Sequence, residues 1–109
     1  MNLLFVCVDE NNLPLGQIRY DYSRTDNRYH IDISVDEVFR FQGLGNEILK
    51  KTLELIKSKQ NITNNLYSKV LSSNISSQKI FIKNNFKIIK KNDSFILFKY
   101  MNLYKYENS

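Results

Sequence analysis

The amino-acid sequence predicts a mixed α+β fold with the element order β-β-β-α-β-α-β-β. Three observations lead to this prediction. Segments with an apolar residue at every second position fill the first third of the chain, a segment with a helix-period apolar stripe follows, and clusters of Asn, Asp and Ser separate such segments. With 109 residues, 42% of them hydrophobic, the chain can bury a core. We expect one domain over residues 1–109, with a polar tail from about residue 101.

The first three elements are expected to be strands of an antiparallel meander. Residues 3–8 form an apolar run that ends at the turn cluster of residues 9–12. Residues 15–22 and 29–35 alternate apolar and polar side chains, which is typical of half-buried strands. Because short polar turns join these segments, each strand is expected to pair with its neighbour in the sequence.

A helix is expected over about residues 43–58. Leu49, Leu53 and Ile56 recur at helical spacing, and Ile48 and Leu55 widen the apolar stripe. Residues 60–65 indicate a polar connection, and residues 66–71 a fourth strand.

A second helix and a terminal hairpin complete the predicted fold. Ser73 or Asn74 caps this helix, which runs to about Asn84. Asn85 follows, and Asn is the best residue after Gly for a left-handed helix stop. Residues 86–90 and 94–100 are expected to form a hairpin across residues 91–93.

The net charge of +5 and the pI near 9.3 do not by themselves indicate nucleic-acid binding. The lysines are scattered rather than gathered in a basic arm, so we do not expect a nucleic-acid partner, and the same charge favours a polyanionic cofactor. No apolar run approaches the length of a membrane span, and residues 3–8 are too short for a signal peptide. A lone Cys7 cannot form an internal disulfide, which suits a cytoplasmic protein.

Residues 35–50 carry the strongest functional signal. A strand ends, a short loop follows, and Gly43 and Gly45 stand at the start of the expected helix. Unpaired N–H groups, the positive end of the helix dipole and the missing Cβ atoms together predict a main-chain site for a pyrophosphate. A Walker loop needs Lys and Ser or Thr after Gly45, and a dinucleotide fingerprint needs glycine in place of Ile48, so neither fits. A tight turn without a ligand is the alternative.

Two motifs in this order resemble the GNAT family of acyl-CoA-dependent N-acetyltransferases. The first, Arg40-Phe41-Gln42-Gly43-Leu44-Gly45, fits the pattern Arg/Gln-x-x-Gly-x-Gly/Ala. The second covers residues 74–86 and resembles the family's Asn-x-x-Ala-x-x-hydrophobic-Tyr-x-x-x-Gly-Phe. The resemblance extends from about residue 3 to residue 100. It implies transfer of an acetyl group from acetyl-CoA to a primary amine. It also implies two splayed strands, ending at Val35 and Leu71, between which the cofactor enters.

Family members usually begin with a strand and one or two helices that precede this meander. The present chain starts at the family's second strand, which leaves three alternatives open. It is a short enzyme that completes its site in a homodimer, a part of a larger or split acetyltransferase, or a non-catalytic acyl-CoA-binding module. We favour the homodimeric enzyme, because an uncovered sheet edge and core face are liabilities.

The resemblance implies roles for single residues. The cofactor-binding set comprises Ile33, Ser34 and Val35 along the pantetheine arm, Arg40, Phe41, Gln42, Gly43, Leu44, Gly45 and Asn46 around the pyrophosphate, and Asn74 and Lys79 nearby. Backbone N–H groups at Ser34 and Val35 polarise the thioester carbonyl. Asn74 has helix capping as its alternative role, and Arg40 and Lys79 are alternatively surface residues. No metal site is expected.

Proton transfer is the part of the mechanism that the resemblance defines least. Phe81 stands where the family commonly has a Tyr general acid, so that role is vacant or moved. His30 is the first candidate for the general base, because the ordinary histidine pKa of about 6.5 suits proton transfer near neutrality. Its alternative role is that of an ordinary polar strand residue. Tyr29, Asp32 and a water chain are further candidates.

Residues 77–81 bear on the acceptor. Their sequence, Ser-Gln-Lys-Ile-Phe, is similar to members that act on amino-sugar nucleotides. A small-molecule amine such as an amino sugar is therefore the first expectation. Polyamines, lysines and protein N-terminal amines remain open.

Overall fold

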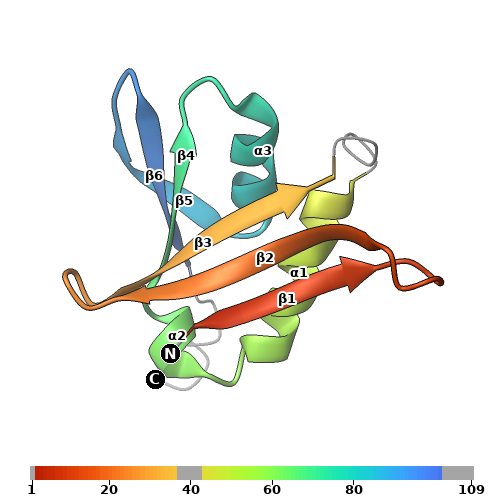
Figure 1. Ribbon diagram of the computed structural model, residues 1–109. Coiled ribbons are helices and arrows are strands. Elements are labelled where there is room, and N and C mark those ends of the chain that lie inside the picture. The colour runs from red at the N-terminus through yellow and green to blue at the C-terminus, as the bar shows by residue number, and fades with distance from the viewer. Residues whose placement is uncertain (1, 37–42, 102–109) are drawn as a thin grey trace.

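The computed structural model describes residues 2–36 and 43–101. Within these residues, six strands form one sheet in the order β1-β2-β3-β4-β6-β5 (Figure 1). In chain order the elements are β1 (Leu3–Val8), β2 (Pro14–Ser23), β3 (Arg28–Val35), α1 (Leu44–Ile56), α2 (Gln60–Thr63), β4 (Leu66–Leu71), α3 (Ile75–Lys83), β5 (Phe86–Lys91) and β6 (Phe95–Tyr100). The mixed α+β class and every predicted strand are confirmed.

The first three strands form the predicted antiparallel meander. Ile18 of β2 lies opposite Phe5 of β1 and Ile33 of β3, so the alternating apolar residues of the three strands share one face. Tyr20, two residues further along, is fully buried beneath α1. Its hydroxyl shares a 2.7 Å hydrogen bond with Thr52 of that helix. Burial raises the pKa of Tyr20 far above its ordinary value, so this hydroxyl stays protonated.

Helix α1 lies against this face of the meander (Figure 1). Ile48, Leu49, Leu53 and Ile56 are buried as predicted. The prediction that Leu55 belongs to the buried stripe is wrong, since its side chain is 66% exposed. Thr52 fills the core position instead. Its hydroxyl, which bonds to Tyr20, also donates to the carbonyl of Ile48 at 2.8 Å.

Residues 60–65 contain a short helix, α2, where the sequence predicted only a polar connection. Ile62 and Thr63 of this helix are each 1% exposed and are part of the buried interior. Four residues make a single turn, which is too short for an apolar period to be recognised in the sequence.

Strands β3 and β4 are parallel and are paired at only two positions. Tyr29 lies opposite Leu66, and His30 lies opposite Tyr67. Beyond these pairs the strands diverge, and β4 continues along β6 (Figure 1). The family resemblance predicted this opening between the strand that ends at Val35 and the one that ends at Leu71.

The β5–β6 hairpin forms the edge of the sheet opposite to β1, and helix α3 packs against β5. Asn74 is the N-cap of α3, and Asn85 has a left-handed φ of 69°, as the sequence predicted. Phe81 of α3 is buried against two hairpin rings, with its centroid 5.0 Å from that of Phe86 and 5.8 Å from that of Phe98.

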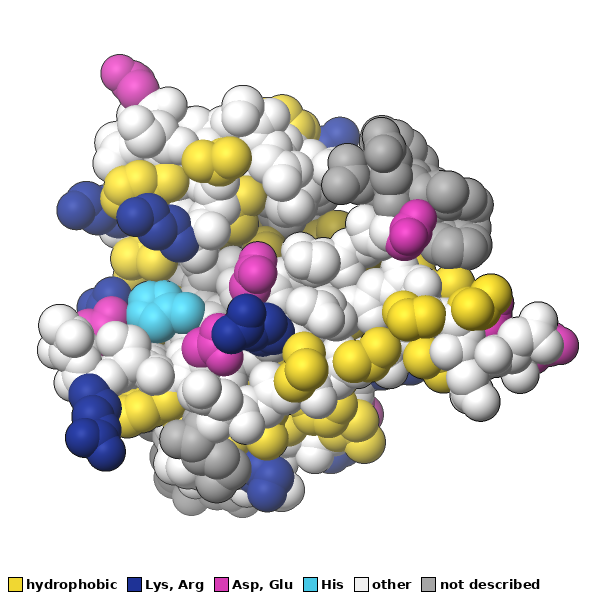
Figure 2. Space-filling model, in the orientation of Figure 1, with side chains coloured by type: hydrophobic (Ala, Val, Ile, Leu, Met, Phe, Trp, Pro, Cys, Tyr) yellow, Lys and Arg dark blue, Asp and Glu magenta, His cyan; other side chains and the backbone are white. Residues whose placement is uncertain are grey.

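The opposite face of the sheet is not covered by any helix within the described residues. Figure 2 shows this face, where a row of exposed hydrophobic side chains follows β1. Leu4, Val6 and Val8 belong to this row. Charged side chains and His30 lie further across the same face.

Candidate functional site

The opening between β3 and β4 has a backbone edge that belongs to β3. The N–H of Tyr29 donates to the carbonyl of Asn65 at 2.8 Å, and the carbonyl of Ile31 accepts from the Ser68 hydroxyl at 3.3 Å, both on the β4 side. Alternate residues of a strand direct their backbone groups to opposite edges. Ile33 and Val35 therefore direct theirs into the opening.

Ser34 has a different orientation from its neighbours. It pairs with Gln17 of β2, and the same alternation directs its N–H and carbonyl toward that strand. The sequence-based set named Ser34 and Val35 together as backbone donors to a thioester. The geometry favours Val35 alone for this role.

Helix α1 begins at the side of this opening. Gly43 is the N-cap, with a left-handed φ of 75° and no side-chain capping bond, and its carbonyl accepts the first intrahelical bond from Glu47 at 3.1 Å. Leu44, Gly45 and Asn46 belong to the first turn, where N–H groups have no acceptor within the helix. These N–H groups and the helix dipole are the features on which the sequence-based prediction of a pyrophosphate site depends.

The two glycines at this helix start have different structural roles. A Cβ atom on Gly43 would meet nothing within 4 Å, so at this position glycine supplies the left-handed backbone and open space. A Cβ atom on Gly45 would lie 3.0 Å from the Cδ1 of Ile80 and 3.8 Å from the Cγ2 of Val35. Gly45 therefore lets the start of α1 approach both α3 and the end of β3.

A hydrogen bond between two asparagines links α1 to α3. The side-chain amide of Asn84 donates to the Oδ1 of Asn46 at 2.8 Å and to the carbonyl of Ile80 at 2.8 Å. The Asn46 side chain is thus used within the protein, which leaves its backbone N–H as the group for the predicted cofactor contact. Sequence reasoning missed Asn84, which it treated only as the end of the second helix.

Asn74 has the capping role that was its alternative. Its Oδ1 accepts from the backbone N–H of Ser77 at 3.1 Å and from the hydroxyl of Ser76 at 3.2 Å. Lys79 lies on the exposed side of the same helix. Arg40, Phe41 and Gln42 lie outside the described residues.

His30 lies on the helix-free face beside a carboxylate. Its Nε2 is 3.0 Å from the Oδ2 of Asp26, and its ring centroid is 6.4 Å from that of Tyr67. Desolvation raises the pKa of Asp26, but hydrogen bonds from His30 and Ser23 and the nearby positive charges outweigh this effect and lower it. Asp26 is therefore an anion near neutral pH and accepts a hydrogen bond from the imidazole.

The other candidates for a base occupy different positions. Asp32 is exposed on the same face as His30, opposite Arg19 in the strand register. Tyr29 is 6% exposed and belongs to the core on the helix-covered face. Phe81, at the family's general-acid position, is a core ring with no proton to donate. Among the described residues, no group of three His, Cys, Asp or Glu side chains is arranged to hold a metal ion.

Comparison with known families agrees with this geometry. The model of the acetyltransferase (GNAT) family matches residues 2–86. The chain belongs to the GNAT family of acetyltransferases, and the resemblance deduced from the two motifs is confirmed. A comparison with curated proteins gave no match.

Solved structures of GNAT acetyltransferases share the fold. One is described as a phosphinothricin N-acetyltransferase, with 26% identity, a TM-score of 0.67 and coverage of 87% of this chain and 66% of that one. Another is an alanine acetyltransferase of a ribosomal protein from Vibrio fischeri, with 19% identity, a TM-score of 0.74 and coverage of 94% and 62%. A third is a spermidine/spermine N-acetyltransferase from Vibrio cholerae, with 14% identity, a TM-score of 0.73 and coverage of 98% and 70%.

The chain is shorter than these proteins. It spans between 61% and 66% of the length of several solved structures that it matches. Within the described residues, no helix has the length and apolar character needed to cross a membrane.

Proposed function

We propose that this protein is an N-acetyltransferase that transfers an acetyl group from acetyl-CoA to a primary amine of a small molecule. The observation that carries this proposal is the meeting of two main-chain features at one opening. The β3 edge at Val35 has no β4 partner, and α1 begins beside it. A Cβ atom added to Gly45 would lie only 3.8 Å from the Cγ2 of Val35. One feature suits an extended amide-bearing arm, and the other suits a phosphate.

The residues of the opening fit acetyl-CoA. Ile33 and Val35 offer backbone groups with which a pantetheine arm pairs as an added strand. The N–H groups of Leu44, Gly45 and Asn46 bind the pyrophosphate. When bound, acetyl-CoA supplies an activated acetyl thioester. The N–H of Val35 then donates to the thioester carbonyl and stabilises negative charge on its oxygen.

His30 is the proposed general base. Because the Asp26 carboxylate only accepts hydrogen bonds, it fixes the imidazole proton on Nε2 and leaves the lone pair on Nδ1. His30 lies about 16 Å from Val35 along β3, at roughly 3.3 Å per residue, so the proton of the attacking amine reaches Nδ1 through a chain of water molecules. With Phe81 in the core, the proton for the departing thiolate comes from solvent.

The proposed acceptor is a small cationic amine such as an amino sugar, because the face on which His30 lies also carries acidic side chains. Asp21 lies opposite His30 in the register of β2 and β3, and Asp32 lies two residues further along the same face. These carboxylates attract an ammonium group, which must lose a proton before it attacks. We place this reaction in the cytoplasm. A second copy of the chain would cover the exposed row of β1.

A non-catalytic acyl-CoA-binding module is the second candidate. The buried Phe81 favours it, because the position that commonly supplies a general acid has no proton here. This candidate shares the cofactor site and differs only in the absence of turnover.

The test is an acetyl-transfer assay that detects free thiol. The purified chain is incubated with acetyl-CoA and glucosamine, spermidine or a peptide with a free N-terminal amine, and the His30→Gln variant is the control. Thiol release that depends on one amine class and on His30 supports the enzyme. Binding of acetyl-CoA without release for any amine would support the binding module, and absence of binding would contradict both candidates.

A further inference from the structure

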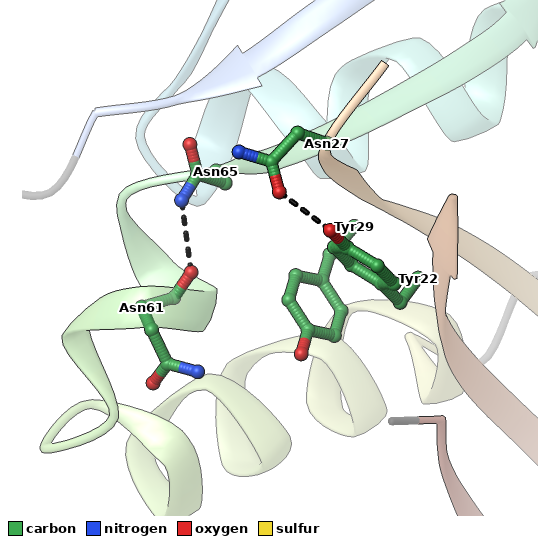
Figure 3. Close-up of a pocket in the computed structure, with 5 residues that line it drawn as sticks. All are labelled: Tyr22, Asn27, Tyr29, Asn61 and Asn65. Atoms are coloured by element: carbon green, nitrogen blue, oxygen red, sulfur yellow. Dashed lines mark hydrogen bonds between the residues drawn. The ribbon is translucent and has the colours of Figure 1, made fainter. Parts of the chain in front are cut away.

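A polar pocket lies at the end of β3 opposite to Val35 (Figure 3). It has a volume of about 400 Å³ and is lined by Tyr22, Asn27, Tyr29, Asn61 and Asn65. These residues come from the β2–β3 turn region and from the segment that contains α2 and leads into β4. Figure 3 shows the asparagines of that segment on one side and the two tyrosine rings on the other. The pocket is separate from the opening described above.

Hydrogen bonds hold the walls of this pocket in place. Asn27 has a left-handed φ of 55°, and its Oδ1 accepts from the Tyr22 hydroxyl at 2.6 Å. The side-chain amide of Asn65 donates to the carbonyl of Asn61 at 2.9 Å. The N–H of Tyr29 donates to the carbonyl of Asn65 at 2.8 Å and joins the two walls. The pocket is therefore formed before any ligand binds.

The pocket also contains polar groups that the described residues leave unused. Tyr29 is 6% exposed and lines the pocket, and the described residues include no buried side-chain oxygen or nitrogen that lacks a partner. Its hydroxyl, which makes none of the hydrogen bonds of these walls, therefore faces the accessible space of the pocket. The amide nitrogen of Asn27, the Oδ1 of Asn65 and the whole carboxamide of Asn61 are likewise outside the hydrogen bonds of these walls. Donors and acceptors are thus mixed around one space.

The chemistry of these groups defines the ligand. Among the described residues, no charged side chain lines the pocket, which favours a neutral molecule. Carboxamides and hydroxyls pair well with hydroxyl groups that both donate and accept. The rings of Tyr22 and Tyr29 are 5.2 Å apart and tilted by 53°, so they form no parallel slot for a flat base. They suit the C–H face of a sugar ring. We propose that this pocket binds a neutral monosaccharide.

The proposal is tested by an NMR titration of the full chain with glucose and with N-acetylglucosamine. Adenosine is the planar comparator. The expected result is saturable shifts, in the millimolar range, confined to the backbone amides of the five lining residues. Saturable shifts at these residues with adenosine and not with the sugars would overturn the proposal, as would no saturable shift with either sugar.

Two variants and one matched control sharpen the test. Asn61→Ala removes an exposed carboxamide, and Tyr29→Phe removes only the hydroxyl, so each is expected to weaken sugar binding about tenfold. Asn11→Ala changes an exposed turn asparagine far from the pocket in the sequence and is expected to leave binding unchanged. Circular dichroism verifies that each variant is folded. Binding that stays unchanged in both pocket variants would overturn the proposal.

Discussion

His30 and Tyr67 form the last register pair that joins β3 to β4. One residue further along β3, the carbonyl of Ile31 accepts from the Ser68 hydroxyl at 3.3 Å, and Val35 has no register partner on β4. The closed end of the opening therefore holds the proposed base, and the open end holds the proposed cofactor edge. Under the proposed function, acid–base chemistry and cofactor binding would lie on the same pair of strands.

Replacement of Gly43 by valine is expected to abolish acetyl-CoA binding. A β-branched residue is strained at a φ of 75°, and its side chain fills the space that a phosphate needs. The strain costs about 1–2 kcal/mol of stability. Isothermal titration calorimetry measures the binding. Gly43→Asn is the matched variant, because Asn accepts a left-handed backbone. Normal binding by the Val variant would show that this helix start does not hold the cofactor.

The strands and the main helices could be predicted from the sequence because their apolar periods are long enough to recognise. Thr52 shows why one core position could not. Its hydroxyl bonds to Tyr20 and to the Ile48 carbonyl, and such pairing across elements leaves no local pattern. The divergence of β3 from β4 was predicted only through the family resemblance. Apolar alternation predicts which face of a strand is buried and does not predict how two strands pair.

The candidate site could be predicted only in part. The glycine loop and Asn74 were found as motifs, but the orientation of the Ser34 backbone toward β2 follows from the hydrogen-bond alternation along β3, which no spacing predicts. The Asn46–Asn84 bond joins residues 38 positions apart. The pocket asparagines were interpreted only as turn residues. The predicted loop residues 40–42 lie outside the described residues, so their role stays a prediction.

His30→Gln is expected to lower kcat by about 10²–10⁴-fold, the usual contribution of a general base. Acetyl-CoA affinity is expected to stay the same, because His30 lies at the closed end of the opening. Steady-state kinetics with the best amine, together with calorimetry, separates the two effects. Asp32→Asn is the comparison variant on the same face. An unchanged kcat in His30→Gln would remove this residue from the mechanism.

Asp26 is expected to make stability depend on pH in the acidic range. Its pKa is lowered in the folded protein, so the carboxylate contributes stability above the ordinary pKa of about 4 and loses it as the pH falls through the folded value. Asp26→Asn should therefore be less stable than the wild type near neutrality and converge with it in acid. Thermal unfolding across this range is the measurement, with Asp93→Asn as the control. A difference that does not change with pH would argue against the Asp26–His30 interaction.

Gly16→Ala is expected to destabilise the fold by about 1–3 kcal/mol, as overpacking usually does. The added Cβ would lie 2.8 Å from the Ser34 carbonyl oxygen and 3.2 Å from the Cδ1 of Ile48. Backbone cannot move aside as a side-chain end can. Gly45→Ala is the contrast, because its Cβ meets the flexible end of Ile80 and a helical position favours alanine. Urea unfolding compares them, and equal stability of wild type and Gly16→Ala would refute the close approach.

Thermal unfolding with acetyl-CoA tests the central claim most directly, which is that the opening between β3 and β4 binds this cofactor. Ligand at about a hundred times its Kd adds roughly 2.7 kcal/mol of stability. For a chain of this size, such a gain raises the Tm by several degrees. The account predicts this rise with acetyl-CoA and a much smaller one with ATP or duplex DNA. No rise with acetyl-CoA, or an equal rise with all three polyanions, would contradict it.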